Sequence, residues 1–226
     1  MTAQNKAPLE QKHLQQVAVI EISNVGHETF IIRIPRCADF SPGQVIGVTT
    51  TPSIPPRLFS LCSGIHDAYW EILFNIKHDG VLSPLLAKLQ PGDTIHVSPP
   101  FGSFIDAETP SWWIATGTGI APFRAMIRSD LGHNKHLVHG ARRTTGFYFA
   151  DELRATLESR YIRCCSQGEG AELYPGRLTH WLQAQQTVPT DIPFLLCGSA
   201  EMVVQVRDIL LTKGVPFEKI RSEIYF

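Results

Sequence analysis

Apolar and polar residues alternate over short stretches in the first hundred positions, which is the pattern of half-buried β-strands. We predict a first hairpin that turns near 24–26 and further strands bounded by Gly and Pro turns. The predicted strands cover 17–22, 30–34, 44–50, 58–63, 70–76 and 93–98. One helix is predicted over 83–89, with Ser83 placed to cap its N-terminus. About six strands at this spacing indicate a small antiparallel barrel or sandwich.

From about residue 112 the pattern changes to short apolar runs that alternate with stretches of helical periodicity. The predicted strand and helix pairs are 112–115 with 121–130, 136–140 with 150–159, 161–165 with 177–184, and 193–197 with 200–212. Such alternation predicts a parallel sheet covered by helices on both faces. Ligands of these sheets bind beyond the carboxyl ends of the strands. We therefore expect 116–119, 140–143, 166–168 and 197–199 to meet in one crevice.

The change of pattern divides the 226 residues into two domains, and we place the boundary between residues 106 and 107. The balance of 20 Lys and Arg against 21 Asp and Glu gives no overall field that would favour nucleic acid or an anionic membrane as partner. The polar N-terminus lacks a signal core, and no segment approaches the roughly 18 apolar residues of a membrane span. We expect a cytoplasmic protein.

Cysteines and histidines give no sign of a metal site. The five cysteines lack paired C-x-x-C spacing, so they are predicted to be reduced thiols and not zinc or iron–sulfur ligands. The nine histidines are scattered, and none forms an H-E-x-x-H pattern. We expect no bound metal.

A glycine loop, Thr116-Gly117-Thr118-Gly119, separates the apolar run at 112–115 from a helix that begins near Pro122. Glycines let the backbone approach a ligand closely, and the N–H groups at a helix start attract phosphate. The loop therefore predicts a nucleotide site. Taken alone, it fits a purely structural strand-to-helix turn equally well.

Two stretches of the first domain carry similar chemistry. Arg57 supplies a bidentate cation for a pyrophosphate, and Phe59 shares its face of the strand. Taken alone, this pair also fits an exposed arginine beside a core phenylalanine. Gly80 to Ser83 open the predicted helix, where N–H groups could hold phosphate, although a turn with a cap explains them equally.

Together these motifs make the chain resemble the ferredoxin–NADP(+) reductase family, and within it the bacterial type. The similar stretches are RLFS (57–60), DGVLSPLLAKLQPGDTIHVSPPFGSF (79–104), GTGIAP (117–122), LVHGAR (137–142), CGSAEMV (197–203) and SEIYF (222–226). They follow the family's order over residues 14–226. The resemblance implies an FAD-binding antiparallel β-barrel (1–106) followed by a Rossmann-like NADP(H)-binding α/β domain (107–226).

The resemblance also implies roles for individual residues. Those implied to bind FAD are Arg57, Phe59, Ser60, Leu73, Phe74, Asn75, Gly80, Val81, Leu82, Ser83, Tyr225 and Phe226. Phe59 stands where the family usually has Tyr, so one hydroxyl is lost while the stacking face remains. Tyr225 is implied to cover one flavin face, and Phe226 to stack on the adenine.

The residues implied to bind NADP(H) are Thr116, Gly117, Thr118, Gly119, Arg142, Arg143, Ser166, Arg177, Cys197 and Gly198. Gln167 stands where the family often has Arg, which leaves NADH open, although NADPH is the expected nucleotide. Ser60, Cys197, Glu223 and Tyr225 are implied to surround the reacting centre. Ser60 would bond near flavin N5, Cys197 would pack on the nicotinamide, and Glu223 would relay protons or position the ring.

The implied activity is transfer of a hydride from NADPH to FAD, followed by single-electron transfer to ferredoxin or flavodoxin. We expect a monomer with acidic protein partners. Two other enzymes fit the motifs: a reductase of free flavin, and the reductase component of an oxygenase. A flavin-binding interaction module without turnover is the alternative outside enzymes.

Overall fold

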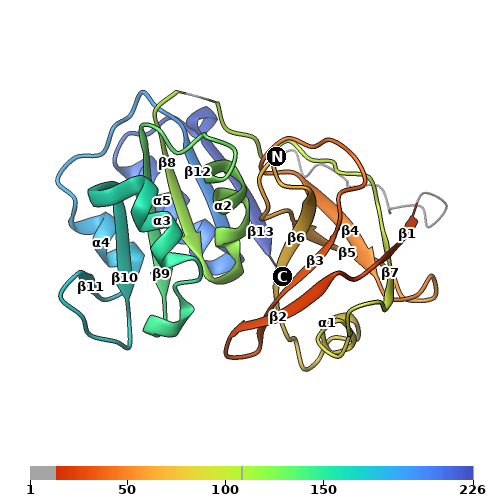
Figure 1. Cartoon of the computed structure of the whole chain (residues 1–226). Coiled ribbons are helices and arrows are strands. Elements are labelled where there is room, and N and C mark those ends of the chain that lie inside the picture. The colour runs from red at the N-terminus through yellow and green to blue at the C-terminus, as the bar shows by residue number, and fades with distance from the viewer. Residues whose placement is uncertain (1–13, 108, 226) are drawn as a thin grey trace.

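The computed structural model describes residues 14–107 and 109–225 and shows two parts side by side (Figure 1). The first, the antiparallel part, covers residues 14–107. Its strands are β1 (Gln15–Ala18), β2 (Glu21–Gly26), β3 (Thr29–Pro35), β4 (Val45–Thr49), β5 (Arg57–Ser60), β6 (Tyr69–Asn75) and β7 (Thr94–Val97). They form one sheet in the order β1-β7-β4-β5 and another in the order β2-β3-β6, and every pair is antiparallel.

The two sheets close on each other around one core. β1 and β2 are one bent strand that passes between the sheets, and the N–H of Ile20 at the bend donates to the Arg33 carbonyl (2.8 Å). A bridge between Leu61 and Ile72 joins the other edges. Alternate side chains fill the interior, with Trp70 fully buried. The antiparallel barrel predicted from the sequence is confirmed.

The helix of this part, α1 (Leu82–Leu86), is shorter than predicted, and Ser83 is not its cap. The helix begins at Leu82, one residue before Ser83, and Val81 takes the N-cap position. Pro84 then lies in the first turn of the helix, where proline is tolerated. The Ser83 hydroxyl accepts a hydrogen bond from the N–H of Lys77 instead (2.8 Å), and so holds the preceding loop.

The second, parallel part covers residues 109–225. Its strands are β8 (Ser111–Thr116), β9 (Lys135–Ala141), β10 (Tyr161–Cys165), β11 (Leu173–Pro175), β12 (Phe194–Ser199) and β13 (Ile220–Tyr225). Its helices are α2 (Ala121–Ile127), α3 (Ala150–Leu157), α4 (Leu178–Ala184) and α5 (Ala200–Thr212), with short 3-10 turns η2 (Gly117–Ile120), η3 (Thr144–Gly146), η4 (Glu158–Arg160) and η5 (Phe217–Lys219). The strand order is β11-β10-β9-β8-β12-β13, all parallel, as predicted.

Two strands of this sheet were not predicted. β11 is only three residues long, and β13 mixes polar and apolar residues, so neither gives a clear apolar run. Of these two strands, β13 matters most, because it carries Glu223 and Tyr225 to the junction of the two parts.

The helix predicted over 121–130 ends at Ile127, because the chain turns there and Asp130 has a positive φ of 64°.

A buried ion pair fixes the segment that joins the two parts. Lys135 is fully buried, and its ammonium donates to Asp106 (2.8 Å) and to the carbonyls of Ala107 and Thr109 (2.5 Å each). Asp106 also accepts from Trp113 Nε1 (2.7 Å). These donors satisfy the hydrogen-bonding needs of the buried Asp106 carboxylate. They also hold the segment that joins the two parts against β8, the first strand of the parallel sheet.

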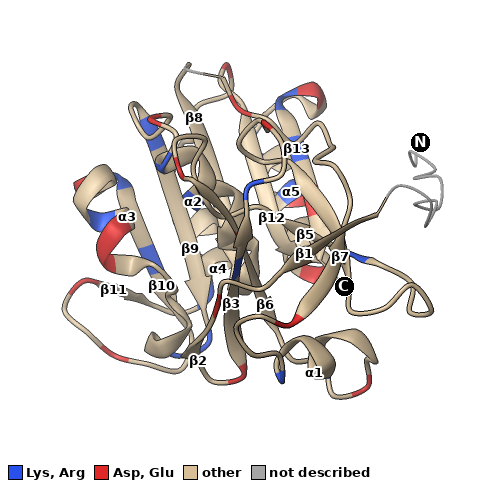
Figure 2. Ribbon diagram, turned by 45° about the vertical axis from the view of Figure 1, so that its right-hand side comes forward, with Lys and Arg blue, Asp and Glu red and all other residues tan. Residues whose placement is uncertain are grey.

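Charged and apolar contacts also join the parts face to face. Leu73 and Phe104 of the antiparallel part lie in one buried cluster with Trp113 and Phe123 of the parallel part. Beside them, Arg124 of α2 donates to the buried Glu71 of β6 (2.7 Å). Elsewhere, acidic and basic residues are spread over both parts (Figure 2). In residues 14–107 and 109–225, no helix combines the length and apolar character of a membrane span.

Candidate functional site

The glycine loop follows β8 at the carboxyl edge of the parallel sheet. Gly117 has a φ of +56°, and a Cβ added there would meet nothing within 4 Å. Gly119 is the opposite case, since an added Cβ would lie 2.3 Å from the carbonyl oxygen of Cys197. The loop is therefore packed against β12 on one side and open on the other. Thr116 Oγ1 is buried here and has no hydrogen-bond partner among the described residues.

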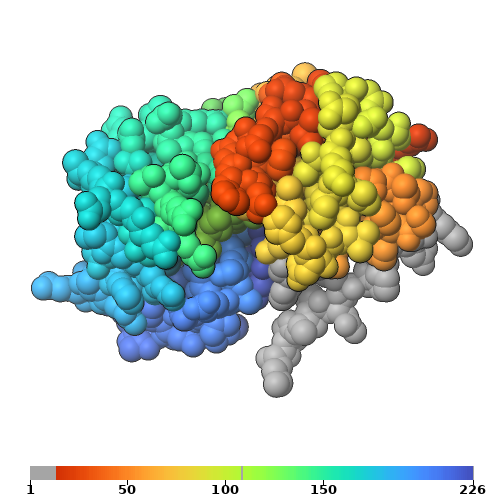
Figure 3. Space-filling view, turned by 90° about the horizontal axis from the view of Figure 1, so that it is seen from below, coloured from red at the N-terminus to blue at the C-terminus, as the bar shows by residue number. Residues whose placement is uncertain are grey.

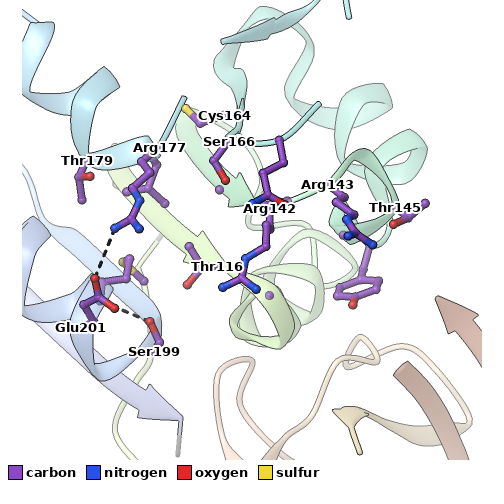
Figure 4. A pocket seen from close by; sticks show the side chains of 18 of the residues that line it. Thr116, Arg142, Arg143, Thr145, Cys164, Ser166, Arg177, Thr179, Ser199 and Glu201 are labelled. Atoms are coloured by element: carbon purple, nitrogen blue, oxygen red, sulfur yellow. Dashed lines mark hydrogen bonds and ion pairs between the residues drawn. The ribbon is translucent and has the colours of Figure 1, made fainter. Parts of the chain in front are cut away.

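A cavity of about 830 Å³ lies in front of this loop (Figure 4). Four of the predicted strand ends line it. The lining residues from these ends include Thr116, Gly117, Gly140, Ala141, Arg142, Arg143, Ser166, Gln167 and Ser199. Backbone bonds tie two of the ends together, because the N–H of Gln167 donates to the Arg142 carbonyl (2.8 Å). The parallel topology thus gathers segments far apart in the sequence around one space.

Three arginines give the cavity a basic wall. Arg142 and Arg143 are exposed, and neither side chain makes an ion pair or hydrogen bond with any residue that the structure describes. Arg177 lies 3.4 Å from Glu201, and both side chains are largely exposed. Unpaired guanidinium groups around a concave surface attract phosphate, and their planar forks suit bidentate contacts.

A second cluster lies where the two parts meet. The hydroxyl of Tyr225 donates to Ser60 Oγ (2.5 Å), and Ser60 Oγ donates to Glu223 Oε2 (3.2 Å). The register of β13 against β12 pairs Cys197 with Glu223 and Ser199 with Tyr225. The structure therefore brings together the predicted reacting-centre residues from β5, β12 and β13.

Burial controls the protonation of this cluster. It raises the pKa of the Cys197 thiol well above its usual value, and the nearby Glu223 raises it further. Burial likewise raises the pKa of the Tyr225 hydroxyl, assisted by Cys197 and Glu223. Both shifts favour the protonated forms near neutral pH, so little of the Cys197 thiol is present as the reactive thiolate.

Apart from Tyr225 on β13 and Phe226, the residues predicted to hold flavin lie on the antiparallel part. Arg57 is exposed and has no side-chain partner among the described residues, while the Phe59 ring packs edge-on against Phe74 (centroids 6.1 Å apart). The side chains of Leu73 and Phe74 are buried. β6 is an edge strand, and its Glu71 carbonyl accepts from Cys62 on the side away from β3 (2.8 Å).

Residues two apart on a strand direct their backbone groups to the same side. The backbone groups of Leu73 and Asn75 therefore face the same side of β6 as the Glu71 carbonyl, away from β3. Gly80 and Val81 are exposed, Leu82 is buried in the barrel, and Ser83 is bonded to Lys77. Phe226 lies outside the described residues.

Not all predicted nucleotide-binding residues line the cavity. Thr118, Gly119, Cys197 and Gly198 lie outside its lining, and of these Gly119 and Gly198 are packed between β8 and β12. Conversely, several residues that do line it were not among the predicted site residues, although Glu201 and Met202 lie within the CGSAEMV stretch. These are His27, Thr145, Gly146, Tyr148, Cys164, Leu178, Thr179, Glu201, Met202 and Gln205. Asn75 was predicted to contact flavin and also lines this cavity.

Comparisons with known proteins agree with this arrangement. Residues 113–208 match the family described as the oxidoreductase NAD-binding domain. The chain is 32% identical over 189 residues to the flavodoxin/ferredoxin–NADP reductase of Escherichia coli, covering 73% of this chain and 76% of that protein. A ferredoxin NADP+ reductase from Neisseria gonorrhoeae, solved with FAD and NADP, has the same fold, with a TM-score of 0.84, 21% identity and coverage of 95% of this chain and 99% of that one.

The chain therefore belongs to the ferredoxin–NADP reductase family of oxidoreductases. The family also includes relatives with other partners. The toluate 1,2-dioxygenase electron transfer component of Pseudomonas putida is 25% identical over 88% of this chain, and the chain spans only 64% of that protein's length.

Proposed function

We propose that the chain is an FAD-dependent reductase that moves electrons between NADPH and a one-electron carrier, ferredoxin or flavodoxin, and that it acts as a monomer. We assign FAD to residues 1–106 and NADP(H) to residues 107–226. The observation that carries the proposal is the cluster of Ser60, Glu223 and Tyr225, which joins the two parts beside the strand that backs the glycine loop. Similarity to the E. coli and N. gonorrhoeae reductases supports it.

The residues of the cavity fit a dinucleotide phosphate. Gly117 leaves the space in front of the loop open, and the unpartnered Thr116 Oγ1 could bond a ligand oxygen there. Arg142 and Arg143 have no competing carboxylate among the described residues. Their charges favour NADPH over NADH, because a 2′-phosphate must exchange water for charged donors.

The antiparallel part fits FAD by the chemistry of its donors. Arg57 is an exposed, unpartnered cation for a pyrophosphate, and the open edge of β6 offers backbone groups of Leu73 and Asn75. Bound FAD would supply the conversion of a two-electron donor to single-electron transfer, which no side chain performs. The five cysteines are free thiols, which fits the reducing cytoplasm that we propose as the compartment.

The chain's own residues would orient and protect the reacting groups. The protonated hydroxyls of Ser60 and Tyr225 form a chain of hydrogen bonds that ends on Glu223, so a proton at Ser60 Oγ has an acceptor within 3.2 Å. Cys197 is buried and neutral, and it excludes water from this junction. Positioning of this kind is the main contribution that a protein makes to hydride transfer.

The test is to load the purified chain with FAD, dialyse it, and titrate it anaerobically with NADPH and NADH in parallel. We expect flavin to be retained, to bleach at lower concentrations of NADPH than of NADH, and to be reoxidised by ferredoxin or flavodoxin. Arg142→Ala should raise the KM for NADPH more than that for NADH, whereas Arg207→Ala, on the exposed face of α5, should change neither. Retained flavin that NADPH never bleaches would contradict the proposal and support an interaction module.

A second candidate is the reductase component of an oxygenase. The relatives named as oxygenase reductase components cover 88% and 93% of this chain, at 25% and 28% identity. Gln167 in the cavity wall, where the family often has Arg, favours this candidate because it removes one cation from the nucleotide site. A preference for NADH in the same titration would favour it. Flavin that washes out on dialysis would instead indicate a reductase of free flavin.

A further inference from the structure

The hairpin between β2 and β3 reaches from the antiparallel part to the cavity of the parallel part. Its tip has a fixed conformation, because the N–H of Gly26 donates to Asn24 Oδ1 (3.1 Å) and Glu28 takes a left-handed φ of 55°. A β-bulge at Asn24 and Gly26 accompanies the turn. The turn leaves the side chain of His27 81% exposed, and His27 lines the cavity.

Contacts with Tyr148 hold the tip against the parallel part. Thr29 Oγ1 and the Tyr148 hydroxyl are 2.7 Å apart, and Asn75 Nδ2 donates to the same Thr29 oxygen (3.0 Å). A Cβ added to Gly26 would lie 3.0 Å from the Tyr148 ring, so a larger residue there would require the ring to shift. In Figure 3 the red hairpin lies directly against the green segment of the parallel part.

The charges around His27 come from three segments. Glu28 lies 3.7 Å from the His27 ring, and His78 lies 2.8 Å from Glu28, so this carboxylate is shared between two imidazoles. Arg142 and Arg143, which follow β9, line the same cavity and have no acidic partner among the described residues. A phosphate bound between the hairpin and these arginines would contact cations from both parts of the chain.

We propose that His27 is a ligand-contacting residue of the dinucleotide cavity, and that its imidazolium adds a positive charge for a phosphate to the charges of Arg142 and Arg143. The inference rests on the proposed function and deepens it. The nucleotide site would then be built from both parts of the chain, with the hairpin as its outer wall. Because an imidazole contributes charge only in its protonated form, the contribution should be larger at acidic than at alkaline pH.

The test compares the wild-type protein with His27→Gln, which keeps a hydrogen-bonding side chain but cannot be charged. Binding of NADP(+), NAD(+) and 2′,5′-ADP to the FAD-loaded protein is measured by calorimetry at pH 6.0 and at pH 8.5. We expect His27→Gln to weaken NADP(+) binding about two- to fivefold at the lower pH and to leave it unchanged at the higher one. The variant and the wild type are compared at the same pH, so any change in the charge of the nucleotide's own phosphate affects both affinities equally and cancels in their ratio.

His66→Gln is the matched control, because His66 is also exposed, also lies near a carboxylate (Asp130, 3.4 Å) and does not line the cavity. It should bind as the wild type does at both pH values. The nucleotide series shows which phosphate is contacted: an effect on NADP(+) and 2′,5′-ADP alone assigns the 2′-phosphate, and an effect on NAD(+) as well assigns the pyrophosphate. Equal ratios of variant to wild-type affinity at the two pH values would overturn the inference. A wild-type protein that binds none of the three nucleotides would overturn the proposed function itself.

Discussion

Arg124 is the side chain whose loss tests the junction of the two parts most directly. Its guanidinium is nearly buried and donates to Glu71 (2.7 Å) and to Glu152 (2.9 Å). It also lies over the Phe149 ring, 4.0 Å from the ring centre. Arg124→Met keeps much of the apolar stem but removes every charged contact. Glu71 would then keep only Arg33, and Glu152 would keep only Arg128.

The magnitude follows from the burial of the two carboxylates. The side chain of Glu71 is only 3% exposed, and breaking a pair at such a site costs about 3–5 kcal/mol because a buried charge is left undercompensated. The remaining bonds from Arg33 place the expected loss near the lower end, at about 3 kcal/mol. Glu152 is 30% exposed and adds about 1 kcal/mol or less. We therefore expect Arg124→Met to lower the free energy of unfolding by about 3–4 kcal/mol.

Urea unfolding followed by fluorescence measures this loss, and Arg128→Met is the control. Arg128 is 29% exposed and pairs with Asp67 and Glu152, so its loss should cost about 1 kcal/mol. The double variant Arg124→Met with Glu71→Gln no longer carries the buried charge. Its loss of unfolding free energy should therefore be smaller than the sum of the losses of the two single variants, by more than about 0.5 kcal/mol. Additive costs, or a smaller loss for Arg124→Met than for Arg128→Met, would refute the reasoning.

Variants at three further sites, two of them with a control variant, test other contacts by chemical unfolding. Gly119→Ala should lower the free energy of unfolding by about 2–3 kcal/mol, because the new Cβ meets the β12 backbone. Its control, Gly117→Ala, should lower it by only about 1–2 kcal/mol, because the one penalty there is the left-handed φ. Equal losses for the two variants would contradict this. Lys135→Met should cost about 3–5 kcal/mol by leaving a buried carboxylate without its cation, and the exposed Lys88→Met should stay within about 0.5 kcal/mol. Burial lowers the pKa of His139 to about 3, so its share of stability is present above about pH 6.5 and is lost as the pH falls towards 3. His139→Gln should remove about 1.4 kcal/mol per pH unit from the slope of stability between pH 6 and 4, and an unchanged slope would contradict this.

The sequence by itself determined most of the elements and the family. The runs at 112–115 and 193–197 are apolar because strands covered on both faces need apolar side chains, and this pattern is visible without any contact being known. The glycine loop could also be located from the sequence, because its residues are neighbours in the chain. Strand ends of a parallel sheet meet at one edge, so the crevice at the loop also followed from the order of elements.

Only the tertiary structure decided which side chains face each other across the two parts. Ser60 meets Tyr225, 165 positions away, because β13 pairs with β12 in one register, and the weak apolar pattern of β13 does not specify that pairing. His27 lines the cavity because a hairpin from the antiparallel part crosses to Tyr148. Periodicity reports how one segment meets the core, whereas such contacts depend on how distant segments pack, which no local pattern encodes.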